Sequence, residues 1–153
     1  MSRTWQVVLG SPVNRRDILG IVRTCREETG RTFNKQYENA ISRFLVDASA
    51  GRIYLIDMRG VPAGYASVSF QQSVTWGGQL AVLEELQLLK AYEGQGLAQR
   101  VLRAIIGDLE NFGPDVVVAY VKEDDPLAAV YEIEGFSRTA LIRYSDQESD
   151  ETC

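Results

Sequence analysis

The sequence has 153 residues, no histidine and only two cysteines, Cys25 and Cys153. Without histidine, Ser-His-Asp and Cys-His catalytic arrangements and histidine-ligated metal sites are excluded. Two cysteines so far apart are too few for a cysteine-rich zinc site, so no metal is expected. Cys25 falls in a helical pattern and is expected to pack as a small apolar side chain.

Long hydrophobic runs are also missing: none approaches the roughly 20 residues of a membrane-spanning helix. The first five residues lack the apolar stretch of a secretory signal, so we expect a cytoplasmic protein that does not bind membranes. The formal net charge of −5 disfavours nucleic-acid binding, which requires a basic surface, and suits a small cationic partner better.

The apolar residues predict one mixed α/β domain over residues 1–145, followed by a flexible acidic tail over 146–153. Helical spacing and glycine stops favour two helices near the amino terminus, one after Gly96 and a short one before Gly135. Period-two and continuous apolar runs predict strands over residues 5–9, 53–58, 63–70, 80–89, 116–121 and 139–144.

Two glycines and an alanine stand between the strand over 80–89 and the following helix, in the order Glu93-Gly94-Gln95-Gly96-Leu97-Ala98. Such a turn lacks bulk, so backbone amides at the helix start can approach a bound group closely. Those amides are unsatisfied donors at the positive end of the helix dipole, and their natural ligand is a phosphate. Neither a dinucleotide fingerprint nor a Walker A loop fits the segment.

Leu83-Glu84-Glu85-Leu86-Gln87-Leu88, followed by this glycine segment, resembles the signature of the GCN5-related N-acetyltransferases (GNAT). Asp124-Asp125-Pro126, Tyr131 and Gly135-Phe136 are similar to a late segment of that family. Residues 70–84, which include Ser73-Val74-Thr75-Trp76-Gly77-Gly78, resemble its diamine (spermidine/spermine-type) branch.

The resemblance implies a mixed, V-shaped sheet of about six to seven strands flanked by four helices, with acetyl-CoA as co-substrate in the cleft. Main-chain groups of Leu86, Gln87 and Leu88 would pair with the pantetheine arm. The pyrophosphate would be held by backbone amides of Gly94, Gln95, Gly96, Leu97, Ala98 and Gln99, and Asp124, Pro126 and Tyr131 would complete the coenzyme site.

The implied reaction is direct attack of a primary amine on the thioester. It needs a base for the ammonium and an acid for the leaving thiolate. With histidine absent, a carboxylate is the base we predict. We predict Glu84 as this base or as the ammonium-binding group, because it shares a strand face with Leu86 and Leu88. Glu85 is the reserve candidate if a β-bulge breaks the two-residue period of the strand. Tyr131 matches the family's acid, and Trp76 is a candidate wall of the amine pocket.

We therefore predict an N-acetyltransferase for a small cationic amine, such as a diamine, polyamine or aminoglycoside-like compound. Acetylation of a peptide amino terminus or lysine is the alternative within enzymes. A catalytically silent acyl-CoA-binding module is the alternative outside them, because Glu93 and Asp124 depart from the family's usual residues. Exposed sheet edges also offer a physical reason for a homodimer.

Overall fold

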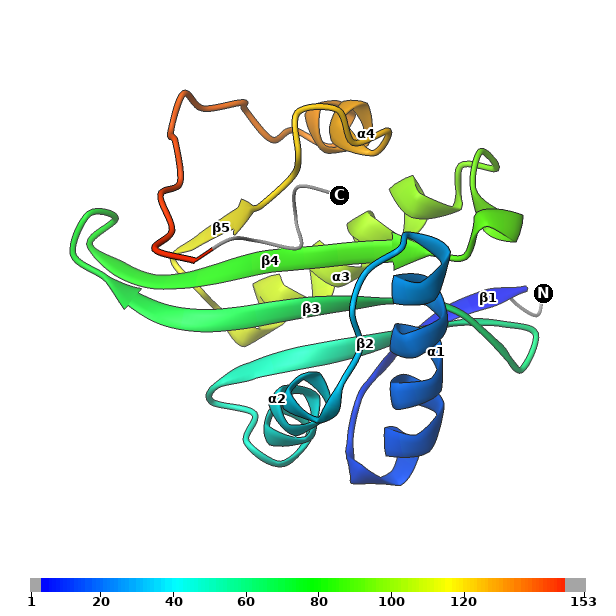
Figure 1. Ribbon diagram of the computed structural model, residues 1–153. Coiled ribbons are helices and arrows are strands. Elements are labelled where there is room, and N and C mark those ends of the chain that lie inside the picture. Colours follow the sequence, from blue (N-terminus) through cyan, green and yellow to red (C-terminus); the bar gives the residue numbers. More distant parts are fainter. Residues whose placement is uncertain (1–3, 148–153) are drawn as a thin grey trace.

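A computed structural model describes residues 4–147 of the chain (Figure 1). Its centre is a five-stranded sheet in the order of the sequence: β1 (Trp5–Leu9), β2 (Gly51–Met58), β3 (Val61–Ser73), β4 (Gly78–Leu88) and β5 (Val116–Ala119). The first four strands are antiparallel, and β5 runs parallel to β4. A parallel neighbour requires a crossover connection, which α3 (Leu97–Phe112) supplies.

Helices cover both faces of the sheet. In front of it in Figure 1 lie α1 (Arg15–Glu28) and α2 (Lys35–Val46), whose apolar stripes pack on Ile53, Leu55 and Tyr65. Behind it lies α3, with Val101, Leu102 and Ile105 fully buried, and the short α4 (Ala128–Ile133) joins the same core through Tyr131. Within the described residues, none of these helices combines the length and hydrophobicity of a membrane span.

The helix boundaries follow local signals. The Asn34 side chain accepts hydrogen bonds from the amides of Gln36 and Tyr37 and caps α2. Gly30 and Gly113 follow α1 and α3 with φ of 69° and 88°, where a side chain would be strained. These glycine stops confirm the helix ends expected from the sequence.

A β-bulge and an early strand end shape the middle of the sheet. Ser67 on β3 pairs with Glu85 while Val68 pairs with Leu83, so Glu84 is an extra residue on β4. One residue earlier β4 loses its other neighbour: the pairing with β5 ends at Leu83 and Ala119. From Glu84 onward the two strands separate, and this opening positions the candidate site.

The fold class is confirmed, but the predicted strand count of six to seven is too high. Residues 139–144 were expected to form a last strand; instead they run along the outside without strand pairing. The apolar side chains of Leu141, Ile142 and Tyr144 are largely exposed, so the segment lacks the packed face that stabilises a strand. The predicted tail lies outside the described residues from 148 on, as does Cys153.

We expect Ile105→Ala to lower the free energy of unfolding by about 2–5 kcal/mol, because it leaves a cavity under fully buried atoms. Urea denaturation followed by circular dichroism measures the loss. Ile133→Ala is the matched control, since Ile133 is 66% exposed and its truncation is expected to change stability by about 0.5 kcal/mol or less. Equal losses in both variants would contradict the placement of the core.

Candidate functional site

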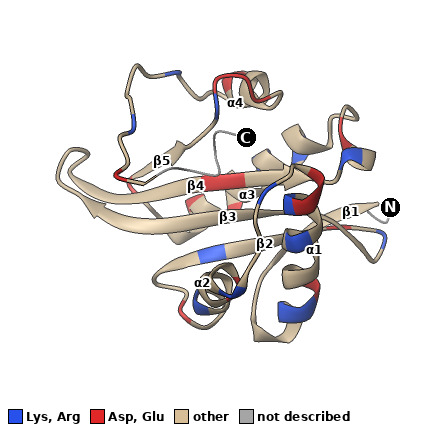
Figure 2. Cartoon of the chain, viewed as in Figure 1, with Lys and Arg blue, Asp and Glu red and all other residues tan. Residues whose placement is uncertain are grey.

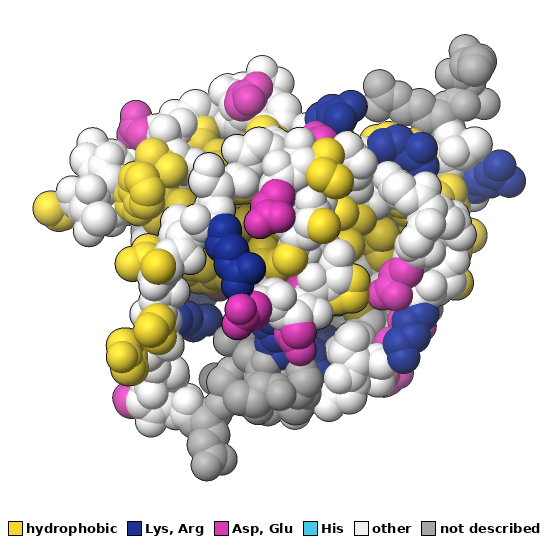
Figure 3. All heavy atoms as spheres, turned by 90° about the horizontal axis from the view of Figure 1, so that it is seen from above, with side chains coloured by type: hydrophobic (Ala, Val, Ile, Leu, Met, Phe, Trp, Pro, Cys, Tyr) yellow, Lys and Arg dark blue, Asp and Glu magenta, His cyan; other side chains and the backbone are white. Residues whose placement is uncertain are grey.

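A large open cleft, about 1890 Å³, extends from the α1–α2 face across the separated strands to α4. It exceeds the roughly 300–1,000 Å³ of an ordinary small-molecule pocket, which leaves room for two ligands. Seen from above, apolar side chains lie inside a hollowed face with charged side chains around it (Figure 3). Most of the site residues predicted from the sequence line this cleft.

The first feature of the cleft is an open backbone edge on β4. The amide of Leu89 donates to the carbonyl of Ala63, so Leu89 directs its main chain toward β3. Because main-chain groups alternate along a strand, Gln87 also faces β3, whereas Leu86 and Leu88 direct theirs toward the separated side. Since β5 has already ended, these groups can receive an extended ligand as an added strand.

The second feature is a row of free amides in the glycine turn and the first turn of α3. Gly94 and Gly96 have φ of 77° and 73°, and a Cβ on either would meet no atom within 4 Å. Backbone conformation, not crowding, therefore requires glycine there. The amides of residues 94–99 donate no hydrogen bond within residues 4–147. Together with the helix dipole, these unsatisfied donors are of the kind that attracts an anion, which is what the sequence predicted for this turn.

Tyr131 stands on α4 with its side chain lining the cleft. It is 7% exposed, packs edge-on against Phe136, and its hydroxyl has no hydrogen-bond partner within the described chain. Burial, assisted by the charge of Asp125, raises the pKa of Tyr131 well above its usual value of about 10. The hydroxyl therefore keeps its proton throughout the physiological pH range.

Helix α4 is held on α3 by Glu134. Its carboxylate accepts two hydrogen bonds from Arg103, at 2.9 and 3.1 Å, and one from Gln99 at 3.0 Å. These donors keep the pKa of Glu134 below its usual value, Arg103 contributing most. Arg103 is thereby engaged in positioning the helix that carries Tyr131.

Glu84 and Glu85 form an acidic segment in the middle of β4 (Figure 2) and have different surroundings. Glu85 accepts a hydrogen bond from the Tyr65 hydroxyl at 2.8 Å and lies 3.4 Å from both Arg26 and Arg31. Glu84, at the bulge, is exposed in the cleft. The bulge also corrects the expected strand face: Leu86 and Leu88 join the α3-side core, whereas Glu84 does not.

The structure also places two other predicted positions. Trp76 lines the same cleft as Glu84 from the β3–β4 turn and is 47% exposed, so its role as a wall of the amine pocket stays a prediction. Asp124 is exposed, and Asp125 supplies the local hydrogen bond, accepting from the amide of Leu127 at 2.8 Å ahead of α4.

Sequence reasoning missed Arg26, Arg31 and Tyr65. Arg26 is 4% exposed, although it belongs to α1, and its guanidinium stacks on the ring of Tyr37 at 4.1 Å. One signal was available: Arg26 falls on the apolar stripe of the helix, directly after Cys25. A cation in such a stripe indicates a buried partner.

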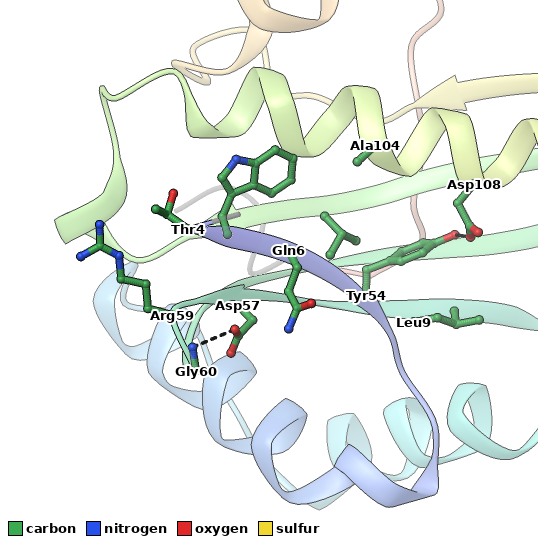
Figure 4. A pocket seen from close by; sticks show the side chains of 11 residues that line it. Thr4, Gln6, Leu9, Tyr54, Asp57, Arg59, Gly60, Ala104 and Asp108 are labelled. Carbon is green, nitrogen blue, oxygen red and sulfur yellow. Dashed lines mark hydrogen bonds between the residues drawn. The ribbon is translucent and has the colours of Figure 1, made fainter. Parts of the chain in front are cut away.

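A smaller pocket of about 620 Å³ lies where β1 meets α3 (Figure 4). Its carboxylates have partners within the described chain. Asp57 accepts from the amide of Gly60, and Asp108 accepts from the Tyr54 hydroxyl and pairs with Arg52. Because these carboxylates are already engaged, the pocket is a weaker candidate for a catalytic site than the cleft.

The comparison with protein families is decisive. A model described as "Acetyltransferase (GNAT) domain" matches residues 21–147. The chain belongs to the GNAT acetyltransferase family. This makes it an N-acetyltransferase, of a family that uses acetyl-CoA. The diamine branch suggested by residues 70–84 is not specifically supported, and no curated protein matches the sequence.

Solved structures share the GNAT fold at low sequence identity. An integron cassette protein from the mobile metagenome of Cole Harbour Salt Marsh has a TM-score of 0.81 at 17% identity, covering 94% of this chain and 91% of that one. The aminoglycoside N-acetyltransferase AAC(6')-Iy in complex with CoA has 0.75 at 13%, covering 97% and 98%. The aminoglycoside acetyltransferase meta-AAC0020, from an uncultured soil metagenomic sample and in complex with sisomicin, has 0.76 at 10%, covering 94% and 97%.

We expect Gly96→Ala to weaken CoA binding about tenfold or more, because a left-handed alanine is strained and the free amides lose their alignment. Isothermal titration calorimetry gives the dissociation constants. Gly107→Ala, in the same helix with nothing within 4 Å of an added Cβ, is the control and should leave binding unchanged. A Gly96→Ala protein that binds CoA as the unmodified protein does would overturn the amide site.

Proposed function

We propose that this acetyltransferase moves an acetyl group from acetyl-CoA to the primary amine of a small cationic substrate, by direct attack of the amine. One observation carries the proposal. The open main-chain edge of β4 leads to the free amides before α3, and a protonated tyrosine lies across the same cleft. A long coenzyme with a phosphate-rich end fits this spatial order of hydrogen-bonding groups, with its extended arm along β4 and its phosphates at the free amides.

The chain's own residues fit such a coenzyme. Leu86 and Leu88 would pair with an extended arm through their main chains, and the amides of residues 94–99 would hold a diphosphate. When bound, acetyl-CoA supplies the activated acetyl thioester. Glu93 also lines the cleft, but it is exposed, so solvent and salt screen its repulsion of an anion.

Charge favours a cationic acceptor. Eight carboxylate residues and five basic residues line the cleft. An acidic surface attracts an alkylammonium group and raises its local concentration. Glu84 lies where the strands separate, and we assign it the role of accepting the ammonium proton, directly or through water. We keep Glu85 as the reserve for that role, because a hydrogen bond from Tyr65 and contacts with two arginines already engage its carboxylate.

Tyr131 is the proposed general acid. A thiolate leaves when the thioester is broken, and it must take up a proton near neutral pH because an ordinary thiol has a pKa of about 8.5. The Tyr131 hydroxyl carries a proton at this pH and lines the cleft from α4, which makes it the proton source that we assign.

We expect Tyr131→Phe to lower kcat about 100-fold or more while the dissociation constant for CoA stays within about twofold, because only the proton is removed. Release of free thiol measures turnover, and calorimetry measures binding. Phe136→Leu changes the packing on the ring but keeps the hydroxyl, so it should retain most of the turnover. Unchanged turnover in Tyr131→Phe would remove the proposed role.

Glu84→Gln is expected to abolish activity near pH 7 and to recover part of it toward pH 9–10, where the amine loses its own proton. The kcat/KM profile against pH tests this. Glu85→Gln is the contrasting variant: it removes the charge that pairs with buried Arg26, so a loss of stability should dominate. A Glu84→Gln profile that parallels the unmodified enzyme would rule out Glu84 as the base.

The sequence also left open a catalytically silent acyl-CoA binder, because Glu93 departs from the family's usual residue; the family membership and the exposure of Glu93 both weigh against it. Calorimetry and thiol release separate the two. Binding of acetyl-CoA without thiol release across diamines, polyamines and aminoglycosides would support the silent binder and contradict transfer to those amines.

A further inference from the structure

The wall of the cleft beside the bulge carries two arginines around one carboxylate. Arg26 Nη1 and Arg31 Nη2 each lie 3.4 Å from the same oxygen, Oε1 of Glu85, and the Tyr65 hydroxyl donates to Oε2 at 2.8 Å. All four residues line the cleft. They come from α1, the loop after it, β3 and β4, so the fold assembles this group from distant parts of the sequence.

The two arginines differ in how many partners their guanidinium groups have within the described residues. Arg26 Nε donates to the carbonyl of Thr32, and its guanidinium lies on the Tyr37 ring, so Arg26 is held on several sides. Arg31 has only the long contact with Glu85, and its Nε is buried with no acceptor in the described chain. A buried donor without an acceptor costs free energy unless a ligand supplies one.

The local charge balance points to the class of ligand. Two guanidiniums face one carboxylate, and the neighbouring Tyr65 and Cys25 are neutral at physiological pH: burial raises the pKa of Tyr65 well above its usual value and that of Cys25 to about 12. Glu28, which acts on Cys25, accepts from the amide of Lys90 and does not line the cleft. Within the group formed by Arg26, Arg31, Tyr65 and Glu85, two guanidiniums therefore share one carboxylate, while the adjacent carboxylate of Glu84 is the group assigned to the substrate amine.

We propose that Arg31 binds a carboxylate of the acceptor, so that the substrate is a cationic amine that also carries an acid group, as a free diamino acid does. This rests on the proposed function and narrows it. The planar guanidinium fits a carboxylate through two parallel hydrogen bonds. Arg31 contacts Glu85, the residue next to Glu84, so carboxylate and amine of one small molecule reach their partners together.

Matched substrate pairs test the proposal: lysine against cadaverine and ornithine against putrescine, which differ only in the carboxylate. The expected result is a kcat/KM at least tenfold higher for each amino acid. Arg31→Gln should reduce that ratio to about threefold or less, and Arg31→Lys should restore part of it. Arg16→Gln removes the same charge from an exposed position of α1 outside the cleft and should keep the ratio.

A measurement of amine binding in the absence of coenzyme distinguishes failure of the proposed function from failure of the carboxylate site. If all four amines, together with a polyamine and an aminoglycoside, are inert in the acetyl-transfer assay, yet lysine binds at least tenfold more tightly than cadaverine and Arg31→Gln removes the difference, the proposed function fails and the carboxylate site stands. If acetyl transfer proceeds equally well with both members of each pair, the function stands and the carboxylate site is overturned. The absence of any carboxylate preference in both assays also overturns it.

Discussion

The separation of β4 from β5 after Leu83 is the constraint on which the site depends. A strand inside a sheet uses its backbone groups on both sides, and such groups are rarely left without partners. Here β4 continues to Leu88 while β5 ends at Ala119, so one side of β4 has main-chain donors and acceptors available. The bulge at Glu84 lies at the point of separation and shifts the alternation, so that Leu86 and Leu88 direct these groups outward.

The elements around this opening place candidate binding and catalytic groups on both of its sides. The glycine turn before α3 adds backbone amides whose dipoles attract an anion without a formal charge. This matters because the chain as a whole has a net charge of −5 and would repel an anion. Glu134 holds α4 against α3 through Arg103 and Gln99, and thereby carries Tyr131 to the cleft. On the opposite wall, Arg26 and Arg31 fix Glu85, which leaves Glu84 as the carboxylate facing the opening.

Much of this could be predicted from local patterns, because a glycine turn, an amphipathic helix and a helix stop depend on neighbouring residues. The free amides at Gly94 and Gly96 are such a case. The strand expected over residues 139–144 was wrong because pairing depends on a partner edge, which apolar alternation does not report. The roles of Arg31, Glu85 and Arg103 could not be predicted, since each depends on contacts between residues that lie 20 or more positions apart in the sequence.

Amide hydrogen exchange followed by NMR tests the central claim most directly, because it reports on the individual donors. Saturating CoA should slow exchange at Leu86, Leu88 and the amides of residues 94–99, while Gln87, whose main chain faces β3, should change little. Unchanged exchange at the outward-facing positions with CoA bound, or no binding at all, would contradict the account.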